Sequence, residues 1–238
     1  MQRIPEPELM DEKEQAVAYA AADFAEPHNR VVDLFDRHFP DRPVGGTLLD
    51  LGCGPGDICF RMARRFPALC VHGIDGSDAM LDLARRRLKE EADLQERLRF
   101  SKARITDLPP AAGNWDAILC TSLLHHLHQP LDLWKTIDRL ADARTFIFVV
   151  DLFRPASPEK AQWIVEHYSG NEPDILKRDF YNSLLAAFTP PEVEQQLNAA
   201  GLSGLTVATI SDRHLLVYGR KAASSSFTVS SPSISSNS

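Results

Sequence analysis

Short apolar runs alternate with amphipathic stretches along most of the chain, and this rhythm predicts its secondary structure. Between the runs, apolar side chains recur at helical spacing, for example Ile58, Met62 and Phe66 within residues 57–66. A second amphipathic stripe begins after Ser77, a residue type that favours helix N-caps. Strands that alternate with helices in this way predict a parallel, doubly wound sheet of the α/β class. The runs that we interpret as strands are residues 47–51, 70–75, 98–103, 115–120 and 145–153.

The pattern changes in the last third of the chain. Residues 157–187 look helical and contain no strand pattern, so we predict a helical insertion over about residues 154–203. Thr189 and Glu192 have the spacing of a capping box, and Gly201 is placed to end the helix that this box begins. Two further apolar runs, separated by three residues, predict a hairpin whose last strand is antiparallel to the rest of a seven-stranded sheet. The runs of this hairpin are residues 205–210 and 214–220.

The two ends of the chain differ in character from its centre. Residues 1–42 precede the first strand, and within them residues 14–39 read as two helices broken near Pro27. We expect this helical cap segment to lie across the carboxyl edge of the sheet or along its flank. Residues 43–221 are the predicted main domain. The serine-rich residues 222–238 have too little apolar surface to offset the entropy of ordering, so they predict a disordered tail.

Composition and charge narrow the classes of protein. The chain has 238 residues, of which 44% are hydrophobic and 25% charged, and its formal net charge is -7. An acidic chain gains nothing from a nucleic-acid backbone, so DNA or RNA is an unlikely partner. The sequence has no apolar run of membrane-spanning length and no secretory leader, which predicts a cytoplasmic protein without a membrane partner. The cysteines have no metal-binding or redox spacing; they are Cys53, Cys59, Cys70 and Cys120.

The stretch LLDLGCGPGD, residues 48–57, is the most informative motif. It joins the end of a predicted strand to a helix through a turn with glycine at every second position. Ligands of open α/β sheets bind at this edge, and glycine lets them approach the backbone closely. The spacing GxGxG departs from the dinucleotide fingerprint GxGxxG, and Asp57 would repel a pyrophosphate. Together with Asp50, Asp57 favours a ligand that is neutral or cationic at this turn. Both acids therefore argue against the cofactor of a nucleotide-dependent oxidoreductase.

The motif LDLGCGPGD resembles the first motif of the class I, Rossmann-like, seven-stranded S-adenosylmethionine (SAM) methyltransferases. The segment GIDGSDAML resembles the second motif of that family, and TDLPP and WDAILCTSLLHHL resemble its third and fourth segments. The resemblance covers about residues 45–151 together with the terminal hairpin. It implies a Rossmann-like fold, S-adenosyl-L-methionine as the cofactor and S-adenosyl-L-homocysteine as its product.

The resemblance also implies which residues form the cofactor site. Asp75 would accept hydrogen bonds from both ribose hydroxyls, and Gly76 and Met80 would flank the adenine. Thr121 would meet the methionine end of the cofactor. The residues implied to surround the methionine part and the sulfonium are Asp50, Gly52, Cys53, Gly54 and Gly56.

The adenine side shows one departure from the family pattern. Arg104 stands where many members have an aspartate that accepts from the adenine amino group. That contact is therefore expected from the backbone of Ile105 or from Asp107.

The segment LLHHLHQP places His125, His126 and His128 close together. On a helix, neighbouring residues point about 100° apart, so only His125 and His128 would share a face. Neither HExxH nor CxxC is present, and no metal site is predicted. Family members often carry LHHL here, which leaves packing or a place in the site wall as the two interpretations.

The resemblance implies methyl transfer, which is an in-line displacement at a carbon that already carries its leaving group. The protein must align the acceptor and exclude water, and it needs a base only if the attacking atom is protonated. The candidate catalytic residues are His126, His125 and Tyr19, while Arg154 could bind a substrate carboxylate or lie at the surface. We predict a SAM-dependent methyltransferase of small molecules with an O, N or C nucleophile. The alternatives are a tRNA or protein acceptor, and a non-catalytic SAM-binding regulatory or partner protein.

Overall fold

The computed structural model describes residues 1–8, 24–42, 45–109 and 115–221. The described residues therefore exclude the first of the two predicted N-terminal helices, which contains Tyr19. They also exclude the predicted tail of residues 222–238.

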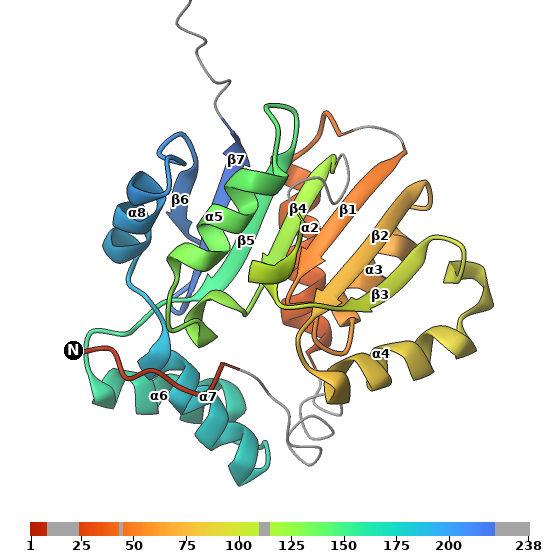
Figure 1. Cartoon of the computed structure of the whole chain (residues 1–238). Helices are drawn as coiled ribbons and strands as arrows, with labels where there is room; N and C mark the ends of the chain where they lie inside the picture. Colours follow the sequence, from red (N-terminus) through yellow and green to blue (C-terminus); the bar gives the residue numbers. More distant parts are fainter. Residues whose placement is uncertain (9–23, 43–44, 110–114, 222–238) are drawn as a thin grey trace, which may run out of the picture.

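A single seven-stranded sheet forms the centre of the fold, in the order β3-β2-β1-β4-β5-β7-β6 (Figure 1). The first five strands are parallel to one another, and β7 is antiparallel to both β5 and β6. This arrangement confirms the predicted α/β sheet with an antiparallel last strand. The strands are β1 (Gly46–Leu51), β2 (Leu69–Asp75), β3 (Leu98–Lys102), β4 (Ala117–Thr121), β5 (Phe146–Leu152), β6 (Thr206–Thr209) and β7 (His214–Arg220).

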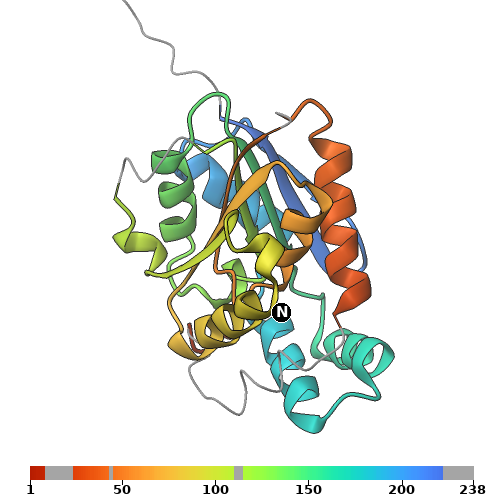
Figure 2. The same cartoon turned by 90° about the vertical axis from the view of Figure 1, so that its right-hand side faces the viewer.

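Helices cover both faces of the sheet, and Figure 2 shows α2 and α5 on opposite sides of it. Successive strand residues point to opposite faces. Leu48 and Phe148 therefore pack in one hydrophobic cluster with α2 and α3, whereas Leu49 and Ile147 pack in another with α5 and α8. The covering helices are α2 (Ala25–His38), α3 (Asp57–Arg65), α4 (Asp78–Glu90), α5 (Leu131–Leu140) and α8 (Pro190–Ala199).

The predicted helix caps are confirmed. The Ser77 hydroxyl accepts a hydrogen bond from the Met80 backbone N–H at the start of α4. Thr189 and Glu192 form both halves of a capping box at the start of α8. Gly201 follows α8 with φ +76°, a left-handed conformation that glycine adopts without a steric penalty.

The second predicted N-terminal helix begins close to the predicted break near Pro27. Helix α2 begins at Ala25 and continues through Pro27 to His38. Proline is tolerated in the first helical turn because its missing N–H would have no partner within the helix. Helix α2 is also part of the core, since Phe35 is buried and packs edge-to-face against Phe148 of β5.

Helices α6 (Pro158–Ser169) and α7 (Asp174–Ala186) pack against each other beyond the carboxyl end of β5 and form their own small core. The N-terminal segment, residues 1–8, runs across them in Figure 1, and the Ile4 backbone N–H donates to the Leu185 carbonyl at 3.0 Å. No helix in the described ranges is long and apolar enough to cross a bilayer. Three short 3-10 helices complete the fold: η1 (Ala92–Leu94), η2 (Ile105–Asp107) and η3 (Leu124–His126).

Candidate active site

A cavity of about 1020 Å³ lies beyond the carboxyl ends of β1, β2 and β4. Its wall continues through the start of α2, the helices α6 and α7, and the loop between β6 and β7. The loop after β1 and the helical insertion therefore open into one space, although they are far apart in the sequence. Ligands of parallel α/β sheets bind at this edge.

The glycine loop, residues 52–56 after β1, forms the floor of this cavity. The backbone N–H groups of Gly52 and Cys53 both donate to the Ile74 carbonyl, at 2.8 and 3.0 Å, which ties the loop to β2. Gly54 has φ +53°, and a Cβ added there would meet no atom within 4 Å. A left-handed glycine with open space beside it leaves the backbone accessible to a ligand.

Asp50 and Gly56 do not line the cavity, which differs from the predicted contact with the methionine part. Asp50 is completely buried beneath the loop, where Oδ2 accepts from the Cys59 thiol at 3.0 Å. Burial raises the pKa of Asp50 to about 7, although the hydrogen bond from Cys59 partly offsets this effect by lowering the pKa. Gly56 has φ +83°, and a Cβ there would lie 2.6 Å from the Phe100 ring. Both residues support the loop from behind.

Asp75 lines the cavity at the end of β2, next to Gly76. Its Oδ2 accepts from the Gly54 N–H and its Oδ1 from the Ser77 N–H, both at 2.8 Å. These two bonds hold the carboxylate in one orientation beside the glycine loop. Each carboxylate oxygen can accept more than one hydrogen bond, so a ligand diol could add to this arrangement.

The other predicted cofactor residues fall on the same wall, with one exception. Met80, Thr121, Arg104 and Ile105 line the cavity, but Asp107 does not. The Ile105 carbonyl accepts from the Thr136 hydroxyl at 3.2 Å, which anchors this stretch to α5. Of the two residues expected to replace the missing family aspartate, only Ile105 reaches the cavity.

Asp57 lies at the cavity rim in contact with three basic side chains. Its carboxylate is 2.6 Å from His28 Nδ1, 2.7 Å from Arg61 Nε and 2.9 Å from Arg87 Nη1. Burial raises the pKa of Asp57, but the hydrogen bonds from these residues outweigh it and hold the pKa well below its usual range. Because its charge is compensated, Asp57 does not repel a pyrophosphate as the sequence suggested. His28 lies in the first turn of α2 and lines the cavity.

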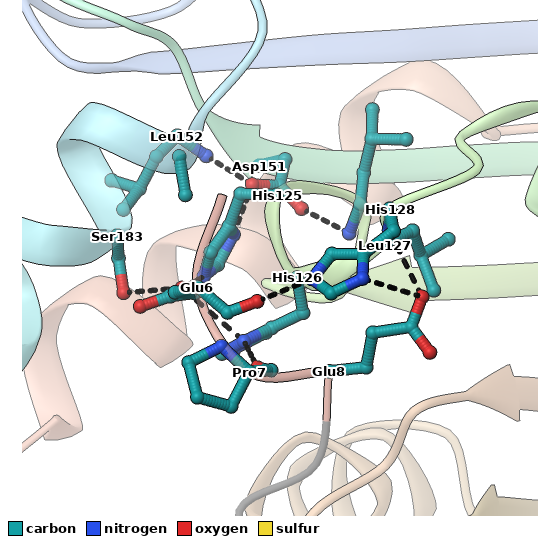
Figure 3. A network of polar contacts seen from close by, with 12 residues as sticks. Glu6, Pro7, Glu8, His125, His126, Leu127, His128, Asp151, Leu152 and Ser183 are labelled. Atoms are coloured by element: carbon teal, nitrogen blue, oxygen red, sulfur yellow. Dashed lines mark hydrogen bonds and ion pairs between the residues drawn. The ribbon is translucent and has the colours of Figure 1, made fainter. Parts of the chain in front are cut away.

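His125 and Asp151 form a buried pair at the cavity wall (Figure 3). The distance from His125 Nδ1 to Asp151 Oδ1 is 2.6 Å. Asp151 also accepts from the backbone N–H groups of Leu124 and Leu152, each at 2.7 Å. Burial lowers the pKa of His125, but the attraction of Asp151, the hydrogen bond to it and the charge of Glu6 together raise it above its usual value.

Glu6 joins this pair from the N-terminal segment and was not predicted. Its Oε1 lies 3.5 Å from His125 Nε2 and 3.2 Å from His126 Nδ1, and it accepts from the Ser183 hydroxyl at 3.0 Å. Arg3 holds the segment in place by donating to the carbonyls of His125 and Leu127, at 2.9 and 3.0 Å. No local sequence signal connects a glutamate near the start of the chain with these histidines.

The structure also corrects the predicted orientation of the histidines. Leu124–His126 is a 3-10 turn, and the rings of His125 and His126 lie with their centroids 4.2 Å apart. His126 lines the cavity, and burial together with repulsion from His125 lowers its pKa to about 3. The potential ligand atoms of Glu6, His125 and His126 all lie within 4.8 Å of one another. The geometric reason for predicting no metal therefore does not hold.

Arg154 does not reach the cavity, so the predicted substrate-carboxylate contact is not formed by this residue. Its guanidinium is buried, donates to the Ala187 carbonyl at 2.7 Å and pairs with Glu192 at 2.7 Å. It thus links the end of β5 to the capping box of α8.

The strand order, the glycine loop and the acid at the end of β2 together define a class I, Rossmann-like methyltransferase fold. Residues 48–143 match the family model described as a methyltransferase domain. Over these residues the chain is similar to class I SAM-dependent methyltransferases, whose fold it shares.

Among curated proteins, the chain is 30% identical over 142 residues to a demethylmenaquinone methyltransferase of Lactococcus lactis. That match covers 59% of this chain and 55% of the relative, so it spans about half of the relative's length. A putative O-methyltransferase of Nostoc punctiforme has the same fold, with a TM-score of 0.64, 17% identity, and coverage of 87% of this chain and 59% of that one. Magnesium protoporphyrin IX methyltransferase of Synechocystis, solved with bound S-adenosylhomocysteine, has a TM-score of 0.58, 17% identity, and coverage of 82% and 83%.

Proposed function

We propose that this protein is a SAM-dependent methyltransferase that acts on a small-molecule acceptor. The observation that carries the proposal is the single cavity that joins the glycine loop and Asp75 to the helical insertion. A volume of about 1020 Å³ is at the upper end of the range for small-molecule sites, about 300–1000 Å³. It suits a cofactor together with a small acceptor.

The cofactor half of the proposed site contains the glycine loop and the end of β2. The Asp75 carboxylate is already oriented by Gly54 and Ser77, which supports a role as acceptor for the ribose hydroxyls. We assign Gly52, Cys53 and Thr121 to the methionine end of SAM because they line the cavity. The residues assigned to the adenine are Gly76, Met80, Arg104 and Ile105.

The acceptor half of the proposed site is bounded by α6, α7 and the β6–β7 loop. Leu176 and Phe180 provide an apolar wall. The Tyr168 hydroxyl donates to Asp212 at 3.0 Å, and the Arg213 guanidinium carbon lies 3.3 Å from the centre of the Tyr168 ring. An apolar wall with a few placed polar groups is typical of sites for small organic ligands. The two relatives described above are named for demethylmenaquinone and magnesium protoporphyrin IX, which are also small molecules.

The proposed chemistry is an in-line displacement. The acceptor atom forms a bond to the methyl carbon while the bond from that carbon to the sulfonium breaks, and the sulfur keeps the electron pair. The protein contributes by aligning acceptor and cofactor and by excluding water. His126 and His125 line the cavity and remain candidate residues for contact with the acceptor. Whether the acceptor is an O, N or C nucleophile, and the cytoplasmic location, stay predictions.

Calorimetric titration of the purified protein with S-adenosylhomocysteine, at neutral pH with a chelator present, tests the cofactor. We expect micromolar binding, and a titration with NAD under the same conditions is the control. Transfer of a labelled methyl group from SAM to candidate metabolites, with tRNA and protein as competing acceptors, then tests the substrate class. A folded protein that does not bind S-adenosylhomocysteine would contradict the proposal.

A further inference from the structure

We propose that Glu6, His125 and His126 bind one divalent transition-metal ion of the zinc class, and that Asp151 orients His125 for this purpose. Figure 3 shows the three side chains converging from the N-terminal segment and from η3. This inference does not depend on the proposed methyl transfer, because it is argued from the distances between potential ligand atoms and is tested without SAM.

The distances between the potential ligand atoms support the proposal. Glu6 Oε1 lies 3.5 Å from His125 Nε2 and 3.2 Å from His126 Nδ1. Ligand atoms about 2.0–2.2 Å from a tetrahedral zinc ion lie roughly 3.3–3.6 Å apart. The two pairs that include Glu6 are therefore spaced as ligands of one ion should be, and all three potential ligand atoms lie within 4.8 Å of one another.

The surroundings of His125 also match those of a metal ligand. A histidine that binds a metal through one ring nitrogen usually donates from the other to a carboxylate, which fixes the ring and its tautomer. His125 Nδ1 has such a partner in Asp151, which is itself held by two backbone N–H groups. The ring is thereby oriented with Nε2 toward Glu6.

Glu6 and His126, the other two proposed ligands, also have hydrogen-bond partners within the protein. Glu6 accepts from Ser183, and its backbone carbonyl is 2.8 Å from His128 Nε2. His126 Nδ1 lies 3.3 Å from the Pro7 carbonyl. Coordination through Nδ1 would require the neutral tautomer of His126 that carries its proton on Nε2.

The type of ligand indicates the class of ion. Two imidazoles and one carboxylate suit zinc, cobalt(II), iron(II) or nickel(II), whereas magnesium and calcium prefer oxygen ligands alone. Three protein ligands also leave a fourth position for water or another small ligand. His125 and His126 line the cavity, so this position would be reachable from it. As ligands, the two histidines would act through the ion and not as free bases.

The N-terminal segment makes the site possible. Arg3 fixes it against the carbonyls of His125 and Leu127, and an ion would add a second link between the segment and η3. His128 belongs to the same histidine-rich stretch but has a half-exposed ring that contacts the backbone of Glu6. It therefore helps to position the backbone of Glu6.

The test is a titration of the full chain with Co²⁺, followed by displacement with Zn²⁺. The protein carries a histidine-free affinity tag at its C-terminus, because the N-terminus supplies Glu6. We expect one Co²⁺ per chain, with visible absorption bands of nitrogen and oxygen ligation and no thiolate charge-transfer band. Zn²⁺ should then abolish the bands.

Variants localise the ion. Glu6→Gln and His126→Ala should weaken Zn²⁺ binding by at least about tenfold, and Asp151→Asn by about 10–100-fold. His167→Ala, at an exposed histidine of α6 outside this cluster, should leave the affinity unchanged. Far-UV circular dichroism checks that each variant is folded. The proposal is overturned if the folded wild-type protein takes up no Co²⁺, or if Glu6→Gln and His126→Ala bind it as well as the wild type does. Neither readout involves SAM, so failure here is distinct from failure of the proposed function.

Discussion

The Nδ1 atom of His125 lies 2.6 Å from Oδ1 of Asp151, and both side chains are almost completely shielded from solvent. Asp151 is the last but one residue of β5, and His125 belongs to the turn after β4. Their pairing ties two neighbouring strand ends together at the cavity wall.

We expect Asp151→Asn to destabilise the protein by about 1–3 kcal/mol, because a buried carboxylate that accepts from His125, Leu124 and Leu152 is lost. The free energy of unfolding in urea measures the effect. A matched control is Asp142→Asn, at an exposed aspartate, which should change stability much less. Equal effects of the two substitutions would contradict a stabilising role for the pair.

Asp75→Ala should weaken binding of S-adenosylhomocysteine by about 1–3 kcal/mol, roughly fivefold to 150-fold, through lost hydrogen bonds to the ribose. Calorimetry on the folded variant measures this change. Asp78→Ala is the control, because Asp78 is an exposed residue near by that pairs with Lys102 at the surface. Unchanged affinity in Asp75→Ala would rule out the ribose assignment.

Gly54→Ala and Gly56→Ala should have different consequences although both glycines have positive φ. Each substitution carries the cost of a left-handed alanine, about 1–2 kcal/mol. At Gly56 the new Cβ would also lie 2.6 Å from Phe100, so this variant should lose a further 1–3 kcal/mol, roughly, through overpacking. At Gly54 the Cβ meets no protein atom, so the additional loss should appear in cofactor affinity. Thermal unfolding and calorimetry separate the two effects.

The buried Asp50 predicts a pH dependence of stability. Its pKa is raised from 3.8 to about 7 in the folded protein, so between these values the native state binds a proton that the unfolded state has lost. The contribution of Asp50 to stability is therefore greatest below about pH 4 and falls as the pH rises to about 7. Relative to Asp50→Asn, the wild type should lose about 2–4 kcal/mol over this interval. Urea unfolding of both proteins at a series of pH values measures the difference.

Asp57 provides the opposite case and hence the control for that experiment. Burial raises the pKa of Asp57, but the hydrogen bonds from His28, Arg61 and Arg87 outweigh burial and lower it. The stability that it contributes is present above its unfolded pKa and is lost as the pH falls. A difference between wild type and Asp57→Asn that grew toward acid pH would contradict this assignment.

Local patterns in the sequence determined the elements of this fold. The alternation of apolar runs with helical stripes placed the seven strands, and the caps at Ser77 and Thr189 were readable because capping depends on residues three positions apart. The glycine motif and Asp75 could be predicted to meet because carboxyl ends of neighbouring parallel strands lie at one edge.

Tertiary structure decided which side chains face the cavity. Asp50 and Gly56 belong to the same motif as Gly54, yet they lie behind the loop: Asp50 is a buried residue of β1, and Gly56 packs against Phe100. The orientation of His125 and His126 depends on a 3-10 turn, whereas the sequence argument against a shared face considered a regular helix. Glu6 reaches them only because the N-terminal segment packs along α6 and α7 and is held there by Arg3. Such contacts arise from packing between distant parts of the chain, and short-range sequence periodicity carries no information about them.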